Sequence, residues 1–206
     1  MRVGIDLDNT LISYDRVIYQ LCREREWIDD SFPKNKRKIR DLIRQMPDGE
    51  EHWMSLQALI YVEKMDQAEI MPGAWRFLRG CLERDHSVWI ISHKTRHAAR
   101  DPQRRDMHRI ALDFLQQRGL FSRESLGASF DKDQVIFNQT RDEKIDMIRR
   151  QKCDIFIDDL TEVLLHPEFP DATRKILFDP EGQSGWQDDL WVATSWDQIE
   201  EFVLYA

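Results

Sequence analysis

The chain has 206 residues, 41% of them hydrophobic, and a formal net charge of -8 at pH 7. This length and composition suffice for one sizeable folded domain, or for a core domain with an insertion, and they exclude a mainly disordered chain. The acidic balance argues against nonspecific attraction to nucleic acid or to an anionic membrane surface. We therefore do not expect nucleic acid as a partner.

The cysteines and the apolar runs indicate the cellular compartment of the protein. Cys22, Cys81 and Cys153 are odd in number and far apart, which fits reduced, structural thiols better than a disulfide framework or a zinc site. The apolar runs are too short to span a bilayer, and no export signal is visible. We expect a cytoplasmic protein with no membrane partner.

Four short apolar runs are predicted to be strands that are buried on both faces. They cover residues 3–7, 88–91, 135–137 and 155–157, and further edge strands are expected at 176–178 and 191–193. The segments between the runs have helical periodicity. Alternation of strands and helices is typical of an α/β fold with a parallel sheet and helices on both faces.

Several helix ends are marked in the sequence. Pro72 and Gly73 precede a helical pattern, and Thr140 and Glu143 have the spacing of a capping box. Asp101-Pro102 has the pattern of an N-cap followed by proline at the first helical position, and Gly119 is expected to end that helix.

Residues 13–70 break the alternation, because they hold helical patterns but no convincing strand. We interpret them as a helical insertion after the first strand. The expected domains are therefore an α/β core made of residues 1–12 and 71–206, and a helical insertion made of residues 13–70.

Polar side chains follow the predicted strands at the edge where ligands bind in open parallel sheets. Asp6 and Asp8 end the first run, Ser92 follows the second, Lys144 lies at the start of the helix after the third, and Asp158-Asp159 follow the fourth. Carboxylates as close as Asp6 and Asp8 resist joint ionisation, and carboxylate oxygens are preferred ligands of Mg²⁺. By contrast, the acidic pairs at 29–30 and 131–133 lack a preceding strand-like run.

The order of these motifs resembles the haloacid dehalogenase-like (HAD) superfamily, most of whose members are magnesium-dependent phosphatases. The segment Asp6-Leu7-Asp8-Asn9-Thr10-Leu11 resembles the first motif of that family, and Ser92, Lys144 and Asp158-Asp159 resemble the other three. The resemblance runs from Gly4 to about Val163. It implies a Rossmann-like core with a cap domain inserted between the first and second motifs.

The resemblance also implies a mechanism. Asp6 would be the nucleophile that forms an aspartyl-phosphate, and Asp8 would be the general acid and base. Mg²⁺ would be bound by the Asp6 side chain, the Asp8 main-chain carbonyl and Asp158, with Asp159 acting through water or supporting the other ligands. Dehalogenases of this family lack the second aspartate, so Asp8 favours phosphoryl chemistry.

Three further residues have implied roles at the phosphoryl group. Ser92 would hydrogen-bond the transferring group, Lys144 would offset charge between that group and the nucleophile, and Thr10 would orient the first loop. A lysine in the first turn of a helix opposes the helix dipole, which favours a role in the site over a purely structural one.

Two segments of the chain are rich in basic residues. His93 and Lys94 are followed by Arg96, His97, Arg100, Arg104, Arg105 and Arg109. We interpret His93 and Lys94 as candidate contacts to a second anionic group of the substrate, whereas the arginines fit a solvated helix face paired with Asp101 and Asp106. The basic segment 34–44 fits a solvated helix of the insertion better than a surface that steers phosphorylated substrates or contacts nucleic acid.

The sequence therefore predicts a HAD-like phosphatase that removes phosphate from a small phosphorylated metabolite with Mg²⁺. A nucleotidase or a phosphomutase of the same superfamily, and a noncatalytic protein that binds an anion or RNA on the same scaffold, remain alternatives. The sequence gives neither the substrate nor the oligomeric state.

Overall fold

The computed structural model describes residues 1–184 and 189–205, and it divides the chain into two compact units. The first unit is made of Met1–Ile12, Ile70–Thr95 and the chain from Leu115 onward. The second unit is made of Ser13–Glu69 and Arg96–Phe114. The second unit thus takes in a segment after residue 95 that the sequence placed in the core.

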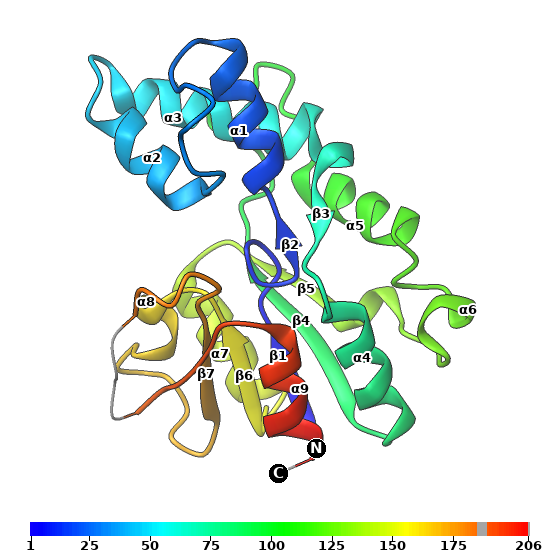
Figure 1. Cartoon of the computed structure of the whole chain (residues 1–206). Helices are drawn as coiled ribbons and strands as arrows, with labels where there is room; N and C mark the ends of the chain where they lie inside the picture. Colours follow the sequence, from blue (N-terminus) through cyan, green and yellow to red (C-terminus); the bar gives the residue numbers. More distant parts are fainter. Residues whose placement is uncertain (185–188, 206) are drawn as a thin grey trace. The chain divides into compact units, whose positions relative to one another are not determined.

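The first unit contains a six-stranded sheet whose neighbouring strands are all parallel (Figure 1). In spatial order the strands are β5 (Val135–Asn138), β4 (Ser87–His93), β1 (Arg2–Ile5), β6 (Ile155–Asp158), β7 (Arg174–Phe178) and β8 (Trp191–Ala193). The predicted α/β class and parallel sheet are confirmed. The prediction that residues 176–178 form an edge strand is wrong, because β7 lies between β6 and β8.

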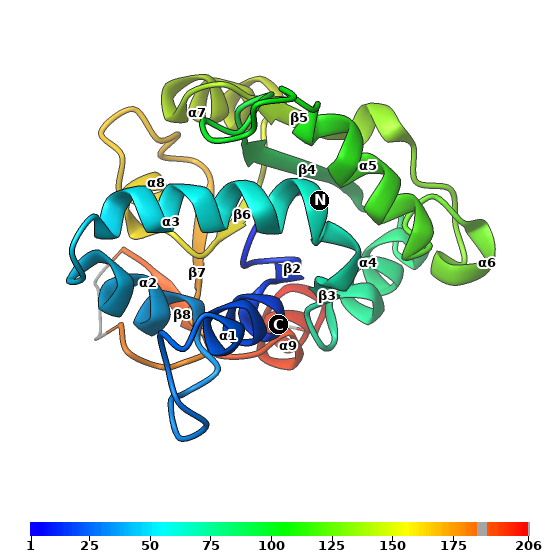
Figure 2. The same ribbon diagram turned by 90° about the horizontal axis from the view of Figure 1, so that it is seen from above.

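Helices cover both faces of this sheet, as Figure 2 shows from above. One face is covered by α4 (Ala74–Glu83) and α9 (Trp196–Leu204), and the other by α7 (Arg141–Arg150) and α8 (Thr161–Leu164). The shorter α6 (Arg123–Leu126) and a 3₁₀ turn, η3 (Lys132–Gln134), precede β5. Because both faces are covered, the strands have continuous apolar sequences.

Alternate residues of each strand supply the two layers of the core. Leu177 packs in a cluster with Phe156 of β6 and with helix residues such as Ile148. The next residue, Phe178, faces the other layer, where its ring centroid lies 5.6 Å from that of Trp196 in α9. This alternation follows from the period of two residues along a strand.

The helix predictions have mixed outcomes. The capping box is confirmed, since Thr140 Oγ1 accepts from Glu143 N at 3.1 Å and the Glu143 side chain accepts from Thr140 N. The predicted helix start at Asp101-Pro102 is wrong: α5 spans Met107–Gln117 and ends just before Gly119. The Asp101 carboxylate is instead used inside a loop, where it accepts from Arg105 N at 2.7 Å.

The second unit is helical. Its elements are α1 (Asp15–Glu24), α2 (Lys36–Arg44), α3 (Gly49–Ala58), a π-helical turn η1 (Leu59–Glu63), a 3₁₀ turn η2 (Met65–Gln67) and the first part of α5. Helix α2 packs against α1 and α3, and it buries Ile39 and Ile43 while Lys38 and Arg44 are exposed. Two short strands, β2 (Ile12–Ser13) and β3 (Glu69–Ile70), pair with each other at the two ends of the inserted segment. The sequence did not predict them.

Ion pairs attach segment 96–114 to the rest of the second unit. Arg100 pairs with Glu51 of α3, and the Arg105 side chain lies 3.0 Å from Glu63 of the π-helical turn. Among the described helices, none is both long enough and apolar enough to cross a membrane.

Candidate active site

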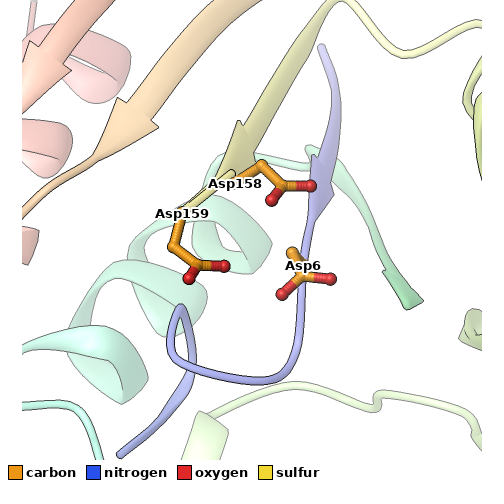
Figure 3. Close-up of side chains that lie close together, drawn as sticks. All are labelled: Asp6, Asp158 and Asp159. Carbon is orange, nitrogen blue, oxygen red and sulfur yellow. The ribbon is translucent and has the colours of Figure 1, made fainter. Parts of the chain in front are cut away.

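Three carboxylates meet at the carboxyl ends of β1 and β6 (Figure 3). Asp6 follows β1, Asp158 is the last residue of β6 and Asp159 comes next. One oxygen from each carboxylate lies within 4.8 Å of the other two. Asp6 and Asp158 are buried, whereas Asp159 is partly exposed. The pairing of β1 with β6 brings these residues together across about 150 positions of sequence.

The ammonium of Lys144 joins two of these carboxylates. Its Nζ lies 2.6 Å from Asp6 Oδ1 and 2.6 Å from Asp158 Oδ2, and the residue is only 1% exposed. The Thr140 cap fixes the first turn of α7, from which Lys144 projects. A buried ammonium is stable only when it is paired in this way.

Burial and neighbouring charges shift the pKa values of this pair. Burial raises the pKa of Asp6 to about 7, with Lys144 acting in the opposite direction and Asp158 adding to the rise. Burial alone would lower the pKa of Lys144, but the Asp158 and Asp6 carboxylates outweigh it, so that pKa is raised. The Lys144 side chain is therefore a fixed positive charge at the site.

The loop after β1 holds its shape through its own hydrogen bonds. The main-chain N–H groups of Leu11 and Ile12 both donate to Leu7 O at 3.0 Å. Thr10 Oγ1 donates to Asp6 Oδ2 at 3.4 Å, so the predicted orienting residue does contact the predicted nucleophile. The loop thus presents the Asp6 carboxylate from a tightly folded backbone.

Asn9 is a site residue that the sequence analysis missed. Its Nδ2 donates to Asp159 Oδ2 at 3.3 Å, and its φ of 64° lies in the left-handed region, which asparagine tolerates better than most residues. The only signal in the sequence was its place between Asp8 and Thr10. Asn9 therefore links the first loop to the carboxylate that follows Asp158.

Ser92 lies inside β4, beside Phe137 of β5 in the parallel register. Its hydroxyl is buried, and no described residue forms a hydrogen bond with the Oγ atom. Its main-chain carbonyl is occupied, because Asn138 Nδ2 donates to it at 3.2 Å. A buried hydroxyl left without a protein partner is costly, and a substrate oxygen would satisfy it.

The second acid of the first motif has a cationic neighbour. Lys94 Nζ lies 2.7 Å from Asp8 Oδ2, and the Lys94 side chain is buried. The Asp8 carboxylate is not part of the three-carboxylate group. His93 is exposed, and its Nε2 lies 3.1 Å from Gln139 O.

The arginines after residue 95 pair with acidic groups of the second unit. Arg105 contacts Asp101 and Glu63, Arg96 lies 3.3 Å from Asp106, and Arg109 lies 3.8 Å from Asp113. In the basic segment 34–44, Arg44 pairs with Glu50 at 2.8 Å. These contacts favour the structural interpretation of both basic segments over an anion-binding one.

The three carboxylates form a donor set that fits a hard divalent cation. They are oxygen ligands, two of them buried, at mutual distances that one ion can span. Three such carboxylates need more positive charge than Lys144 alone provides. Asp6, Asp158 and Asp159 would hold the ion, with the Asp8 main-chain carbonyl as the further ligand that the resemblance implies.

The fold of the chain is similar to that of solved structures. No protein-family model matches the chain, and no curated protein matches it. Solved structures do. A haloacid dehalogenase-like hydrolase from Streptococcus pneumoniae has a TM-score of 0.59 at 14% identity, with 98% of this chain and 97% of that chain covered.

Two further similar structures contain bound ions. A HAD family hydrolase from Deinococcus radiodurans with bound phosphate and sodium has a TM-score of 0.55 at 12% identity, over 98% of this chain and 94% of that one. A HAD-hydrolase from Bacillus subtilis bound to magnesium has a TM-score of 0.54 at 11% identity, over 100% and 98%. At these identities the similarities show the fold alone. They confirm the Rossmann-like α/β fold that the resemblance of the four motifs implies.

Proposed function

We propose that this chain, which has the fold of haloacid dehalogenase-like hydrolases, is a magnesium-dependent phosphatase that acts on a small phosphorylated metabolite through an aspartyl-phosphate. The observation that supports this most strongly is the bridging ammonium of Lys144, 2.6 Å from both Asp6 and Asp158. A buried carboxylate held beside a fixed positive charge and a cation-binding group is suited to attack an anionic phosphoryl group. The phosphate in the Deinococcus radiodurans neighbour is consistent with this chemistry.

In the first step, the Asp6 carboxylate attacks phosphorus and the bond between phosphorus and the leaving oxygen breaks. Asp8 gives its proton to that oxygen, so the leaving group departs as an alcohol. In the second step, Asp8 takes a proton from water, which attacks the phosphorus of the aspartyl-phosphate. Inorganic phosphate is released and the Asp6 carboxylate is restored.

The other residues stabilise charge on the transferring group. Ser92 Oγ, buried and without a described partner, would donate to a phosphoryl oxygen. Lys144 would offset the negative charge that builds up when the group approaches Asp6. A bound Mg²⁺ would supply positive charge for the phosphoryl oxygens and the nucleophile.

We further propose that the second unit is a cap domain that selects the substrate. The sequence predicts a cap at residues 13–70, and we include Arg96–Phe114 in the proposed cap because it belongs to the same compact unit as Ser13–Glu69. His93 and Lys94 remain proposed contacts to a second anionic group of the substrate. The cysteines that the structure describes are free and buried, which supports a reducing compartment such as the cytoplasm.

The test is phosphate release from a panel of nucleotides, sugar phosphates and small phosphorylated acids, with Mg²⁺ present. We expect release by the wild type, none with a chelator, and none by Asp6→Asn. Asp133→Asn is the matched control, because Asp133 is exposed and belongs to the second Asp-x-Asp pair. Equal traces in the wild type and Asp6→Asn would overturn the proposal, and transfer of phosphate within a substrate without release would favour a phosphomutase.

A further inference from the structure

The C-terminal helix contributes a hydrogen bond to the loop that carries the proposed nucleophile. Trp196, the first residue of α9, donates from its indole Nε1 to the main-chain oxygen of Thr10 at 3.1 Å. Trp196 is 1% exposed and Thr10 is fully buried. The bond joins residues 186 positions apart in the chain, and both belong to the first unit.

The position of Trp196 is fixed by its surroundings. Ser195 caps α9 by accepting from Gln198 N at 3.3 Å, which sets the direction of the first turn. The Trp196 ring packs against Phe77 of α4 and Phe178 of β7, with ring centroids 5.2 Å and 5.6 Å apart. Rotation of the indole away from its acceptor would break these two ring contacts.

The residue before α4 makes room for this arrangement. Gly73 has a φ of 86°, and a Cβ atom built there would lie 2.9 Å from Trp196 Cβ. A larger side chain at position 73 would therefore displace Trp196 as well as strain the backbone. The start of α4 thus packs closely against the start of α9, which carries the indole.

Thr10 connects the indole to the nucleophile. Its carbonyl is bound by Trp196, and its hydroxyl donates to Asp6 Oδ2 at 3.4 Å. The peptide that follows Thr10 is also constrained, because Leu11 N donates to Leu7 O. Rotation of the Thr10 carbonyl away from Trp196 would therefore move the hydroxyl that orients Asp6.

We infer that Trp196 is a positioning residue for the reaction, which acts by holding Thr10 so that its hydroxyl sets the orientation of the Asp6 carboxylate. This inference rests on the proposed function, since it assigns Asp6 as the nucleophile. Trp196 touches neither the carboxylates nor a substrate in this assignment. Its effect is confined to the geometry of attack, so it alters turnover and leaves substrate binding almost unchanged.

Trp196→Phe tests the inference, because it removes the indole N–H and keeps an aromatic ring for packing. We expect kcat to fall roughly tenfold while KM stays within about a factor of two, since the Thr10 carbonyl loses its donor. Trp191→Phe is the matched control: Trp191 stacks on Phe202 at the sheet edge, and its replacement should leave kcat unchanged. A Trp196→Phe protein that folds with unaltered kcat overturns the inference.

A second measurement can still be made if the variant does not fold or if no substrate is turned over. In wild-type protein labelled uniformly with ¹⁵N, the indole N–H resonance of Trp196 should shift when Mg²⁺ and inorganic phosphate are added together, whereas that of Trp191 should not. A Trp196 resonance that ignores the ligands while site residues respond overturns the inference. This shift in a protein without phosphatase activity would contradict the proposed function, while the coupling of Trp196 to the Asp6 site would stand.

Discussion

The ammonium of Lys144 lies 2.6 Å from Asp6 Oδ1, although 138 positions separate the two residues in the chain. Lys144→Met would leave the buried carboxylates of Asp6 and Asp158 without their counter-ion. Removing one partner of a buried ion pair typically costs about 3–5 kcal/mol, and we expect a loss of this size in urea unfolding without metal. Mg²⁺ should restore part of the stability, because it supplies positive charge at the same carboxylates.

The prediction is tested by comparing the stability loss of Lys144→Met with and without Mg²⁺. A loss of equal size with and without Mg²⁺ would mean that the cation does not bind at these carboxylates. Lys152→Met is the matched control, since Lys152 is exposed, and it should change neither stability nor the response to Mg²⁺.

Ser92→Ala should separate stability from activity. The Ser92 hydroxyl is buried without a described partner, so its removal should leave the free energy of unfolding unchanged or raise it by up to about 1 kcal/mol. Loss of a donor to the phosphoryl group should lower kcat/KM by about tenfold or more.

Thr173→Val provides the opposite pattern for comparison. Thr173 Oγ1 donates to Cys153 O at 2.7 Å in the buried core, so this variant should lose about 1 kcal/mol of stability or more and keep its activity. If Ser92→Ala is as active as the wild type, Ser92 has no role at the phosphoryl group.

The carboxylates after β6 should differ in their effect on metal affinity. Asp158 is buried and bound to Lys144, whereas Asp159 is partly exposed and hydrogen-bonded to Asn9. By calorimetric titration with Mg²⁺, we expect Asp158→Asn to weaken binding by about 100-fold or more, and Asp159→Asn by about tenfold. Unchanged Mg²⁺ affinity in Asp158→Asn would exclude the proposed cation site.

In the second unit, Asp101 should make stability depend on pH. The Arg105 side chain lies 2.9 Å from the Asp101 carboxylate and lowers its pKa to about 2, against about 3.9 in an unfolded chain. A lowered pKa means that the fold favours the ionised form. The stabilisation is therefore complete above about pH 4 and is lost as the pH falls toward about 2.

Asp101→Asn should accordingly be less stable than the wild type at about pH 7, and the difference should vanish near pH 2. Thermal unfolding at the two pH values measures this. In an Arg105→Met background the same substitution should have a much smaller effect, because the main hydrogen-bond donor is gone. A difference that is constant with pH would show that Asp101 is not held ionised by Arg105.

Much of the candidate site could be predicted because each motif follows a local pattern. Asp6 and Asp158 end continuous apolar runs, and such runs are strands buried on both faces. The capping box at Thr140 placed Lys144 in the first turn of a helix. Parallel pairing then brings these strand ends to one edge of the sheet, so that local signals predict long-range proximity.

The contacts between distant side chains could not be predicted in the same way. Lys94 with Asp8, Asn9 with Asp159 and Trp196 with Thr10 are single pairs, and a single pair has no periodicity. The grouping of segment 96–114 with the compact second unit could not be predicted for a related reason. The segment is attached there by ion pairs such as Arg105 with Glu63, and the sequence shows charges without their partners.

The Asp101-Pro102 error shows the limit of capping patterns. An aspartate before proline fits an N-cap, but a loop can use the same carboxylate to bind its own backbone. Here Asp101 accepts from Arg105 N, and Asp106 accepts from His108 N at 3.0 Å at the true start of α5.

The most direct test of the account is to trap the covalent intermediate on Asp6. The enzyme is mixed with its best substrate and Mg²⁺, quenched in acid and treated with borohydride, which reduces an acyl phosphate to an alcohol that mass spectrometry can locate in a peptide. We predict modification at residue 6 in the wild type and none in Asp6→Asn. Modification of another residue during turnover, or turnover of Asp6→Asn at the wild-type rate, would contradict the account.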